Sequence, residues 1–582
     1  MSTFNLPFKE IWCVDFEFRA PDGETPNIRC MVAREVRSGK VIRLWADECQ
    51  GLSHPPFGIG DDSLVVAYYS SAEWGCFMSL GWALPTHVLD LFTEFRCLRN
   101  GTPPIRGNSL VGALGYYGLG SIAVEAKESM RELAMREGEA YTSDEKAALL
   151  AYCESDVIAV GALLGRMVAE IELPQALFRG RYMKAIAKIE RNGVPIDTET
   201  LGKLKGHWSE VRKALIAEVD GRYQVYEGET FKTAKFANLL EANQIFWPRT
   251  ERGALRLDDK TFEEMAKIHP FLEPLRQLRS TLSRLKLNQI ALGSDGRNRC
   301  LLSPFRSITA RNQPSNSKFI YGLPSWARHL IKPTEGMGLA YIDWSQQEIG
   351  IGAALSKDAV MMEAYRSGDF YLTFAKQAGA VPMDATKKSH KAQRELFKQC
   401  ALAVQYGMGE KSLAERIGKT SLEARKLLDL HRSTYPTFWK WSDAALTRAM
   451  TVGELHTTFG WKLHTPRDPN DRSLRNFPVQ ANGSEMLRLA LCFITEAGIK
   501  VCAPVHDAIL IEAPLEDLDG AVLKAQMFMR LASEVVLDGF SLGTDVDVIR
   551  APDRFTPEKG AAMWATVLAC LAAIESAPLE AA

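Results

Sequence analysis

The sequence lacks the features of a membrane protein, a secreted protein or a zinc ribbon. Its eleven cysteines are scattered and include no CxxC pair, which argues against a zinc ribbon or a disulfide scaffold and suits a reducing cytosol. No apolar run reaches about 18 residues, so we expect no membrane span. The N-terminus, MSTFNLPFKE, lacks a charged start followed by an apolar core, and we therefore expect no signal peptide.

A charge imbalance, internal repeats and low-complexity tracts are lacking as well. The net charge of −1 does not mark the whole chain as a nucleic-acid-binding protein, so a site for a polyanion would have to come from local clusters of basic residues. With 582 residues, 46% of them hydrophobic and 24% charged, the composition is that of a soluble protein with several domains.

Two apolar stretches near the middle and the end of the chain carry aspartates. Residues 338–355 read GLAYIDWSQQEIGIGAAL, a short buried strand that ends at Asp343. A strand-end carboxylate lies where ligands and metals bind in α/β folds, although a cap or turn residue is the alternative. Residues 503–514 read APVHDAILIEAP, a second strand with Asp507 at its centre. Side by side, the two carboxylates could hold two divalent cations about 4 Å apart, as in phosphoryl transfer.

A further pair of acids lies in the N-terminal third, where residues 11–18, IWCVDFEF, alternate as a strand. Asp15 and Glu17 share one face and repel each other unless they share a cation; an exposed sheet face is the alternative. A second strand, residues 63–69, precedes a helix for which Ser70 or Ser71 is the predicted cap, with Glu73 in its first turn.

A long helix over residues 141–167 adds a tyrosine and a third aspartate. Thr142 or Ser143 is its predicted cap, followed by acids in the first turn. Tyr152 and Asp156 are four residues apart and lie on one helix face, where a Tyr–Asp surface pair is the alternative interpretation.

The order DxE, E, YxxxD resembles the DnaQ-like 3′→5′ exonucleases of the DEDDy subgroup, which are joined to polymerases. The resemblance covers about residues 8–167 and implies an RNase H-like exonuclease domain over residues 1–175. It implies that Asp15, Glu17 and Asp156 hold one metal ion, that Asp15 and Glu73 hold a second one partly through water, and that Tyr152 orients the attacking water. Glu73 departs from the family, which more often has Asp there.

Between the two acidic regions the chain is charged and helical. Pro174 lies near the expected domain boundary. Helical stretches follow to about residue 223 and over residues 261–288, with Arg and Lys on faces that could simply be solvated. Residues 309–333, rich in Asn, Ser, Pro and Arg, predict an irregular segment whose Arg and Asn could reach the minor-groove acceptors that all base pairs share.

Four motifs occur in order: DWSQQE (343–348), KAQRELFKQCALAVQYGMG (391–409), RNFPVQANGSE (475–485) and VHDA (505–508). They resemble motif A, motif B, the Gln-containing helix and motif C of family A DNA polymerases, the bacterial DNA polymerase I group. The resemblance runs from about residue 181 to the C-terminus. It implies an α/β multidomain chain in which a right-hand polymerase over 176–582 follows the exonuclease: a thumb (about 195–295), a palm with an antiparallel sheet (about 296–355 and 470–582) and helical fingers (about 356–469).

The motif B helix can also be argued from its charges. Arg394, Lys398 and Leu402 are spaced by four and form one stripe, so two cations can meet a triphosphate. The alternative is an exposed basic face continuous with the lysines at 387, 388 and 391.

The resemblance assigns further roles. The expected nucleotide-binding residues are Arg394, Lys398, Leu402, Tyr406, Gln347 and Glu348, with Tyr406 under the nascent base pair and Glu348 as a ribose gate. The expected DNA-binding residues are Arg311, Asn312, Asn476, Gln480 and His506. Asp343, Asp507 and the backbone carbonyl of Trp344 are the expected ligands of two Mg²⁺ ions, and two more are expected in the exonuclease site, with Mn²⁺ as the alternative metal.

Three features depart from the family pattern. Leu402 stands where relatives commonly have an aromatic residue that touches the sugar, and Ala508 replaces the usual acid after Asp507. The third is that the chain begins at the exonuclease-like segment with no 5′-nuclease ahead of it, which is similar to phage replicative enzymes.

The sequence therefore predicts a template-directed DNA polymerase that extends a primer with dNTPs, with 3′→5′ proofreading and a role in phage genome replication. Primer–template DNA and dNTPs are the expected partners of a cytoplasmic monomer, in the host cell if phage-encoded, together with replisome proteins such as a helicase and a single-strand-binding protein. The alternatives are a 3′→5′ exonuclease with a DNA-binding but inactive polymerase half, and a non-catalytic DNA-binding clamp.

Overall fold

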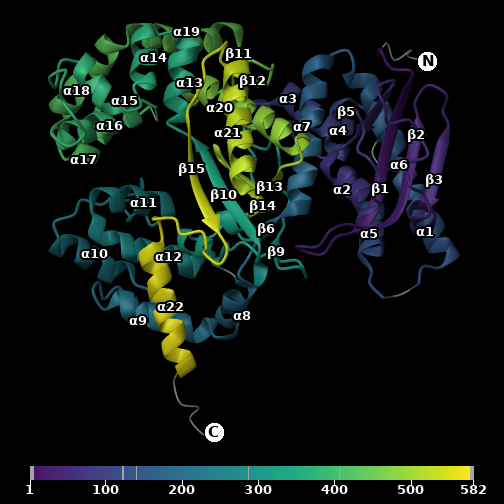
Figure 1. Cartoon of the computed structure of the whole chain (residues 1–582), viewed down its shortest axis with the longest axis horizontal. Helices are drawn as coiled ribbons and strands as arrows, with labels where there is room; N and C mark the ends of the chain where they lie inside the picture. Colours follow the sequence, from purple (N-terminus) through teal and green to yellow (C-terminus); the bar gives the residue numbers. More distant parts are fainter. Residues whose placement is uncertain (1–5, 121–123, 139, 286, 406, 577–582) are drawn as a thin grey trace.

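The computed structural model describes residues 6–120, 124–138, 140–285, 287–405 and 407–576. It forms four regions, of which the central one contains an antiparallel sheet (Figure 1). A domain with its own sheet lies on one side, helices α13–α19 lie above the central sheet, and helices α8–α12 lie below it with α22. We refer to the central, upper and lower regions as the palm, fingers and thumb.

The N-terminal domain is built on a five-stranded sheet in the order β3-β2-β1-β4-β5. Strand β1 runs antiparallel to β2 and parallel to β4, so it has partners on both edges. The strands are β1 (Glu10–Arg19), β2 (Asn27–Glu35), β3 (Val41–Trp45), β4 (Ser63–Ala67) and β5 (His87–Asp90). Both faces of β1 are covered, since Cys13 lies in one hydrophobic cluster and Trp12 in the other. The alternative of an exposed acidic sheet face is therefore wrong.

Helices cover both faces of this sheet: α1 (Ala46–Gln50), α2 (Ser71–Ser79), α3 (Leu91–Arg99), α4 (Leu110–Tyr116), α5 (Val124–Met135) and α6 (Ser143–Met167). Thr142 caps α6 in a capping box with Glu145, as predicted. Ser70 is the N-cap residue of α2, as predicted, but its hydroxyl donates to the buried carboxylate of Asp90 at 2.7 Å and makes no capping hydrogen bond.

Helix α6 is the one helix of the described residues that is long and apolar enough to cross a membrane, a test that a core helix also passes. It packs on β1 and β2 and buries Cys153, Val157, Val160 and Leu164 in the domain core. These apolar residues therefore pack inside the domain.

Helix α7 (Leu173–Asn192) connects the N-terminal domain to the palm. Pro174 lies in its first turn, so the predicted boundary falls at the start of this shared helix. The helix packs on β5 and α2 and also on the palm elements α20 and β13. At Gly180 the backbone of β5 comes so close that an added Cβ would lie 2.0 Å from the carbonyl oxygen of Val88.

A buried ion pair fixes the contact between the two domains. Arg179 of α7 donates from Nε and Nη2 to Glu94 of α3 at 2.6 and 2.7 Å, and the two side chains are only 5% and 2% exposed. Arg179 also donates to the carbonyl of Phe459, and Asn100 donates to the carbonyls of Ile308 and Lys462 at 2.7 Å. The N-terminal domain is therefore bonded to the palm through several backbone acceptors.

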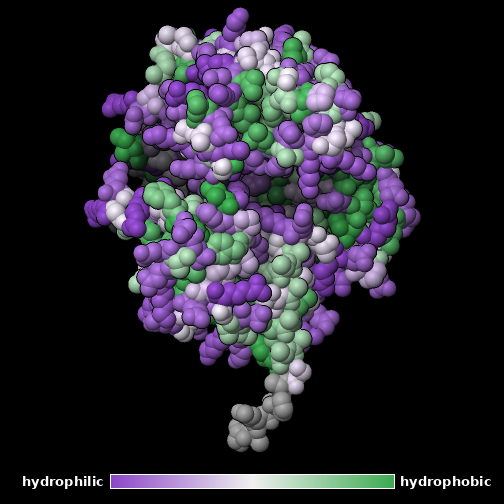
Figure 2. Space-filling view, turned by 90° about the vertical axis from the view of Figure 1, so that its left-hand side faces the viewer, coloured by the Kyte–Doolittle hydropathy of each residue, from purple (hydrophilic) through white to green (hydrophobic). Residues whose placement is uncertain are grey.

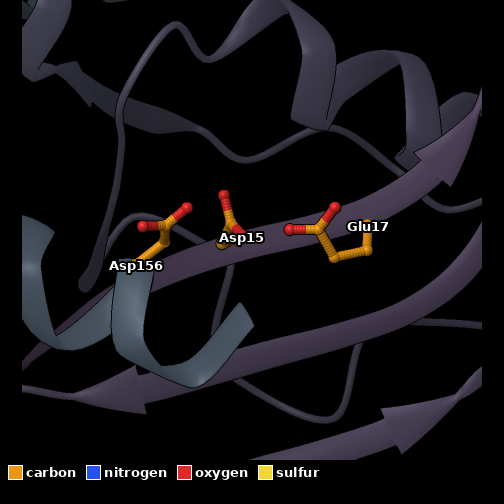
Figure 3. A group of neighbouring side chains, drawn as sticks. All are labelled: Asp15, Glu17 and Asp156. Carbon is orange, nitrogen blue, oxygen red and sulfur yellow. The ribbon is translucent and has the colours of Figure 1, made fainter. Parts of the chain in front are cut away.

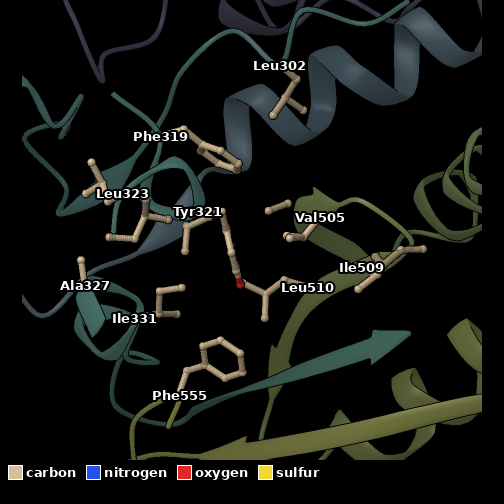
Figure 4. Packing of buried hydrophobic residues seen from close by; sticks show 14 of the residues in the cluster. Leu302, Phe319, Tyr321, Leu323, Ala327, Ile331, Val505, Ile509, Leu510 and Phe555 are labelled. Carbon is tan, nitrogen blue, oxygen red and sulfur yellow. The ribbon is translucent and has the colours of Figure 1, made fainter. Parts of the chain in front are cut away.

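The palm sheet has the antiparallel order β13-β14-β10-β15, with strands β13 (Lys500–Val505), β14 (Ala508–Pro514), β10 (Met337–Trp344) and β15 (Thr544–Arg550). Helices α20 (Asp471–Glu496) and α21 (Leu518–Val536) pack on its strands. Figure 4 shows buried side chains packed beside the sheet, among them Phe319, Tyr321, Ile331, Leu510 and Phe555. Short strands β6 (Val194–Pro195) and β9 (Arg297–Asn298) pair nearby.

The fingers are helical: α13 (Gln347–Ser356), α14 (Ala359–Arg366), α15 (Phe370–Gln377), α16 (Lys391–Gln405), α17 (Glu410–Ile417), α18 (Ser421–Thr434) and α19 (Pro436–Val452). They have a separate hydrophobic cluster around Phe374, Phe397 and Tyr435. A hairpin of β11 (Glu454–His456) and β12 (Lys462–His464) returns the chain toward the N-terminal domain, where β12 contacts α3.

The thumb contains α8 (Thr198–Gly206), α9 (Trp208–Asp220), α10 (Thr233–Ala242), α11 (Asp259–Ile268) and α12 (Glu273–Arg284), with the hairpin β7 (Tyr226–Glu227) and β8 (Thr230–Phe231). The predicted helical stretch over 261–288 is divided at Pro270, where a short 3₁₀ turn begins. The C-terminal helix α22 (Ala561–Ser576) packs on α9 and α12, although it follows the palm in the chain. Figure 2 shows the surface hollowed between fingers and thumb.

Removing one partner of the buried pair should destabilise the protein strongly. Arg179→Ala or Glu94→Ala leaves an uncompensated charge in the interface, and we expect a loss of about 3–5 kcal/mol of unfolding free energy. The matched control is Lys9→Ala, which removes an ion pair to Asp62 whose side chains are 77% and 68% exposed and should leave the stability nearly unchanged. Urea unfolding of the full chain measures both, and equal effects would contradict the structural role.

Candidate active sites

Three carboxylates converge in the N-terminal domain (Figure 3). Asp15 and Glu17 come from β1 and Asp156 comes from α6, and one oxygen of each lies within 4.8 Å of the others. The register of β1 against β2 shifts immediately after Glu17, a bulge of the kind that re-aims side chains. The structure therefore brings together three of the acids that the sequence predicted to share a metal ion.

Glu73 joins this group from the first turn of α2. Its side chain is 4% exposed, and its Oε2 has no hydrogen-bond partner among the described residues. Burial, followed by the charges of Asp15 and Glu17, raises the pKa of Glu73 well above its usual range. An orphaned buried carboxylate oxygen that interacts with the charges of Asp15 and Glu17 fits a divalent cation, since hard cations prefer oxygen ligands. These residues therefore fit the metal that the resemblance implies.

Tyr152 lies one turn before Asp156 on the same helix. Burial, followed by the charges of Asp156 and Glu17, raises the pKa of Tyr152, so its hydroxyl keeps its proton and can donate a hydrogen bond. Sequence reasoning missed Cys153, whose Sγ lies 3.3 Å from Asp15 Oδ2 and 3.2 Å from the Asp15 carbonyl oxygen. Its position in the predicted helix, three residues before Asp156, was the available signal.

The palm carries the second acidic site. Asp343 lies near the end of β10 and pairs in register with Ala508 of β14. The prediction that Asp507 lies at the centre of one strand is wrong, because residues 503–514 form a hairpin whose turn contains His506 and Asp507. His506 has a left-handed backbone, with φ of 59°. The turn still places Asp507 next in the chain to the residue opposite Asp343, so the predicted pair is brought together.

Burial disfavours ionisation of both members of this pair, and neighbouring acids add to the effect at Asp343. Burial, followed by Asp507, Asp545 and Asp547, raises the pKa of Asp343 to about 6, and burial also raises the pKa of Asp507. Asp545 pairs with Asp343 across the sheet, an acid that sequence reasoning missed although the alternation TDVDV was visible. Partly buried, mutually repelling carboxylates fit divalent cations. Trp344 ends β10, and its carbonyl as a ligand stays a prediction.

A cavity of about 1040 Å³ lies between palm and thumb and is lined by Arg311, Asn312 and His506. Burial, followed by the charge of Arg311, lowers the pKa of His506, which favours its neutral form. Gln313, Asn316, Lys318 and Arg328, which the sequence did not single out, line the same cavity.

The loop that carries Arg311 is fixed from two sides. Buried Arg488 of α20 donates to the Ala310 carbonyl at 3.0 Å, and Tyr182 of α7 exchanges a hydrogen bond with Asn312. Ala310 itself is left-handed, with φ of 59°. The helix that joins the domains therefore also holds the predicted DNA-binding loop.

A second cavity of about 470 Å³ opens in the fingers and is lined by Glu348, Asn476 and Gln480. The five predicted DNA-binding residues are thus divided between two cavities. Arg311 of the first cavity and Glu348 of the second form an ion pair of 3.2 Å, which connects the two cavities. Gln347 lies behind Glu348, only 4% exposed, with its side chain against Gly483 of α20.

Helix α16 presents the predicted phosphate-binding stripe. Arg394 donates from Nε to Asp369, at 2.7 Å to Oδ2, whereas Lys398 is 3.8 Å from Glu395 in an exposed pair. Leu402 follows on the same stripe and is half-buried. Tyr406 lies outside the described residues, and Gly407 after it is left-handed, with φ of 59°.

Fold and sites together give a palm with clustered acids and fingers with exposed cations, attached to a mixed-sheet domain with a second acidic cluster. Residues 315–548 match the model of DNA polymerase family A. A solved structure, the POL domain of Pol1 from M. smegmatis in complex with DNA primer-template and dNTP, superposes with a TM-score of 0.70 at 18% identity, covering 95% of this chain and 96% of that chain. This likeness shows the fold.

Curated relatives agree with the family match. DNA polymerase I of Aquifex aeolicus is 26% identical over 388 residues, 64% of this chain and 66% of that protein. The DNA polymerase of Mycobacterium phage D29 is 24% identical over 409 residues, 66% of this chain and 64% of that protein. The thermostable DNA polymerase I of Thermus aquaticus is 24% identical, but the match spans only 46% of it. Most of the chain is therefore similar to family A DNA polymerases of the DNA polymerase I kind.

Neutralising Asp343 should stabilise the metal-free protein at high pH. The folded pKa of about 6 lies above the ordinary 3.8, so the unfolded chain releases this proton first and stability falls as pH rises through that interval. We expect Asp343→Asn to raise Tm in EDTA, and to raise it more at pH 8 than at pH 5. Asp538→Asn, at an 88% exposed side chain, is the control. A gain independent of pH would contradict the raised pKa.

Metal binding at the N-terminal acids should release a proton. Because the pKa of Glu73 is raised well above its usual range, a cation binding there must displace the proton that this side chain carries. We expect calorimetric titration of Mn²⁺ in buffers of different ionisation enthalpy to show proton release at pH 7 that is lost in Glu73→Gln. Glu170→Gln, an acid paired with Arg99 away from the site, should keep it. Unchanged proton release in Glu73→Gln would contradict the assignment.

Proposed function

We propose that this protein is a template-directed DNA polymerase that extends a primer with dNTPs and carries a 3′→5′ proofreading site in its N-terminal domain. The observation that carries the proposal is the palm hairpin, which brings Asp507 to Asp343 inside the segment that matches DNA polymerase family A. A pair of carboxylates beside a large cleft suits phosphoryl transfer.

In the polymerase site, Asp343 and Asp507 would hold the two divalent cations. Bound Mg²⁺ supplies Lewis-acid activation of the attacking 3′-oxygen and neutralises charge on the phosphates. Arg394 and Lys398 would bind the triphosphate from the fingers, where cations stabilise charge that develops in the transition state. Arg394 is the better oriented of the two. Its distance to Asp369 is 2.7 Å, whereas the distance from Lys398 to Glu395 is 3.8 Å.

Substrate recognition would be divided between the two cavities. Arg311 and Asn312, on the loop held by α7 and α20, would contact the primer end through minor-groove acceptors that do not depend on sequence. Glu348 would stand beside the sugar, where its side chain leaves no room for a 2′-hydroxyl. Asn476 and Gln480 line the finger cavity and, with His506, would offer hydrogen bonds near the primer end.

Proofreading would use the N-terminal acids. Asp15, Glu17, Glu73 and Asp156 would hold the cations of this site, and Tyr152, whose hydroxyl keeps its proton, would orient the attacking water. The sheet order, with β1 central and antiparallel to β2 but parallel to β4, supports an RNase H-like domain. A mismatched 3′ end would be hydrolysed here.

The comparisons support the polymerase part of this proposal. The solved relative is described as a complex with DNA primer-template and dNTP, and another relative is a phage DNA polymerase, which supports replication of a phage genome. Both rival interpretations, an exonuclease with an inactive polymerase half and a non-catalytic clamp, leave the acids of one or both sites unexplained. Metal-dependent primer extension separates the proposal from both.

The two activities should be separable by mutation. Asp343→Ala or Asp507→Ala removes a cation ligand from the palm and should abolish primer extension, a loss of at least about 10³-fold, while 3′→5′ degradation continues. Asp15→Ala combined with Glu17→Ala should do the reverse. Denaturing gels of a labelled primer, with and without dNTPs, measure both activities. Asp538→Ala, at an exposed position, is the control, and full extension by Asp507→Ala would sink the assignment.

A further inference from the structure

An acid in the fingers, Asp369, is bonded to Arg394, one of the two predicted phosphate-binding cations. Asp369 accepts both hydrogen bonds of the pair from Arg394 Nε, at 3.0 Å to Oδ1 and 2.7 Å to Oδ2. The two side chains are 19% and 26% exposed, so the pair lies partly out of solvent. Neither the motifs nor the family resemblance singled out Asp369.

Asp369 is itself held in place by the fold. It is the N-cap of α15, where its Oδ1 accepts from the backbone N–H of Leu372 at 3.2 Å. Helix α15 packs on α16, the helix that carries Arg394, and Phe374 and Phe397 form a ring contact between them at 4.6 Å. The carboxylate that grips Arg394 therefore belongs to a rigid pair of helices.

The nitrogen through which Arg394 bonds to Asp369 determines which N–H groups of the guanidinium can still bind a ligand. Both hydrogen bonds leave from Nε, and within the part of the chain that the structure describes no acceptor is bonded to the Nη groups of Arg394. The ring of Tyr371 lies 5.5 Å from the guanidinium carbon and limits its movement on one side. The fork of two Nη groups is the part that matches phosphate oxygens bidentately.

Lys398 provides the contrast within the same helix. Its ammonium is 3.8 Å from Glu395, both side chains are more than a third exposed, and the pair is formed within one turn of the helix. Such a pair adds little and fixes no orientation. Arg394 is thus oriented before any ligand binds, and Lys398 is not.

We propose that Asp369 is a positioning residue for the triphosphate: by holding Nε of Arg394 it aims the Nη fork at the phosphates and reduces the entropy lost on binding. The inference rests on the proposed function, because it takes Arg394 to be a ligand of the incoming nucleotide. It predicts the sign of the mutational effect. A carboxylate that competed with the phosphates would weaken binding, so its loss would tighten binding, whereas loss of a positioning carboxylate weakens it.

The test uses the full-length protein with two substitutions that keep the helix cap. Asn and Ser both cap helices well, but Asp369→Asn keeps one oxygen for Arg394 without charge, whereas the Asp369→Ser hydroxyl is too short to reach it. Glu395→Gln is the matched control, since it removes one negative charge from the same region at the loosely paired Lys398. Arg394→Ala sets the scale for complete loss.

Two measurements separate this inference from the proposed function. Calorimetric binding of inorganic pyrophosphate in the presence of Mg²⁺ needs no turnover, and single-turnover primer extension gives the dNTP dissociation constant and the maximal rate separately. We expect the dissociation constants of pyrophosphate and of the dNTP to rise about tenfold in Asp369→Ser and about threefold in Asp369→Asn. The affinity for primer–template should be unchanged, and Glu395→Gln should behave like wild type.

Each other outcome has one meaning. Dissociation constants of Asp369→Ser that lie within twofold of wild type, or below wild type, would overturn the positioning role. An equal loss of primer–template affinity would overturn it too, because it would show that the fingers had been disturbed as a whole. A wild-type protein that binds pyrophosphate but extends no primer would overturn the proposed function, while the pyrophosphate series would still decide whether Asp369 positions Arg394.

Discussion

Mutual repulsion between carboxylates is the constraint that the structure has to overcome twice. In the N-terminal domain three acids lie within 4.8 Å of one another, and in the palm Asp343 has like charges on its neighbours. The raised pKa of Glu73 and of Asp343 shows that ionising these groups destabilises the metal-free fold. Both sites are built on inner strands, β1 and β10, which are paired on both edges and cannot move apart without breaking a sheet.

The two sites are also fixed relative to each other. Arg179 and Glu94 form their buried pair across the domain contact, and Asn100 and Arg179 reach backbone carbonyls of the palm side. Helix α7 contributes to both domains and, through Tyr182, to the loop that carries Asn312. Under the proposed function, a primer end that needs correction therefore travels between two stationary sites, rather than being followed by a mobile nuclease domain.

What could be predicted from the sequence depended on how local the signal is. Asp15 lies in an alternating strand and Tyr152 on a capped helix, so spacing alone placed both correctly. Asp507 was misplaced because the hairpin turn has neither Gly nor Asn, and His506 adopts the left-handed conformation that those residues usually supply. Asp369 and Asp545 could not be found, because their importance comes from contacts with residues 25 and more than 200 positions away in the chain.

The cations of the cleft are already paired in the protein without DNA, which affects how ligands enter. The pair of Arg311 with Glu348 must open if both side chains are to contact substrate, since each gives its charge to the other at 3.2 Å. This pair is a single contact of 3.2 Å, so a polyanion can compete with Glu348 for Arg311. The pair of Arg394 with Asp369 differs, because it uses Nε and, among the described residues, leaves the Nη groups without a bonded acceptor. Glu348 therefore has to release Arg311 when substrate binds, whereas Asp369 can stay bonded to Arg394 throughout.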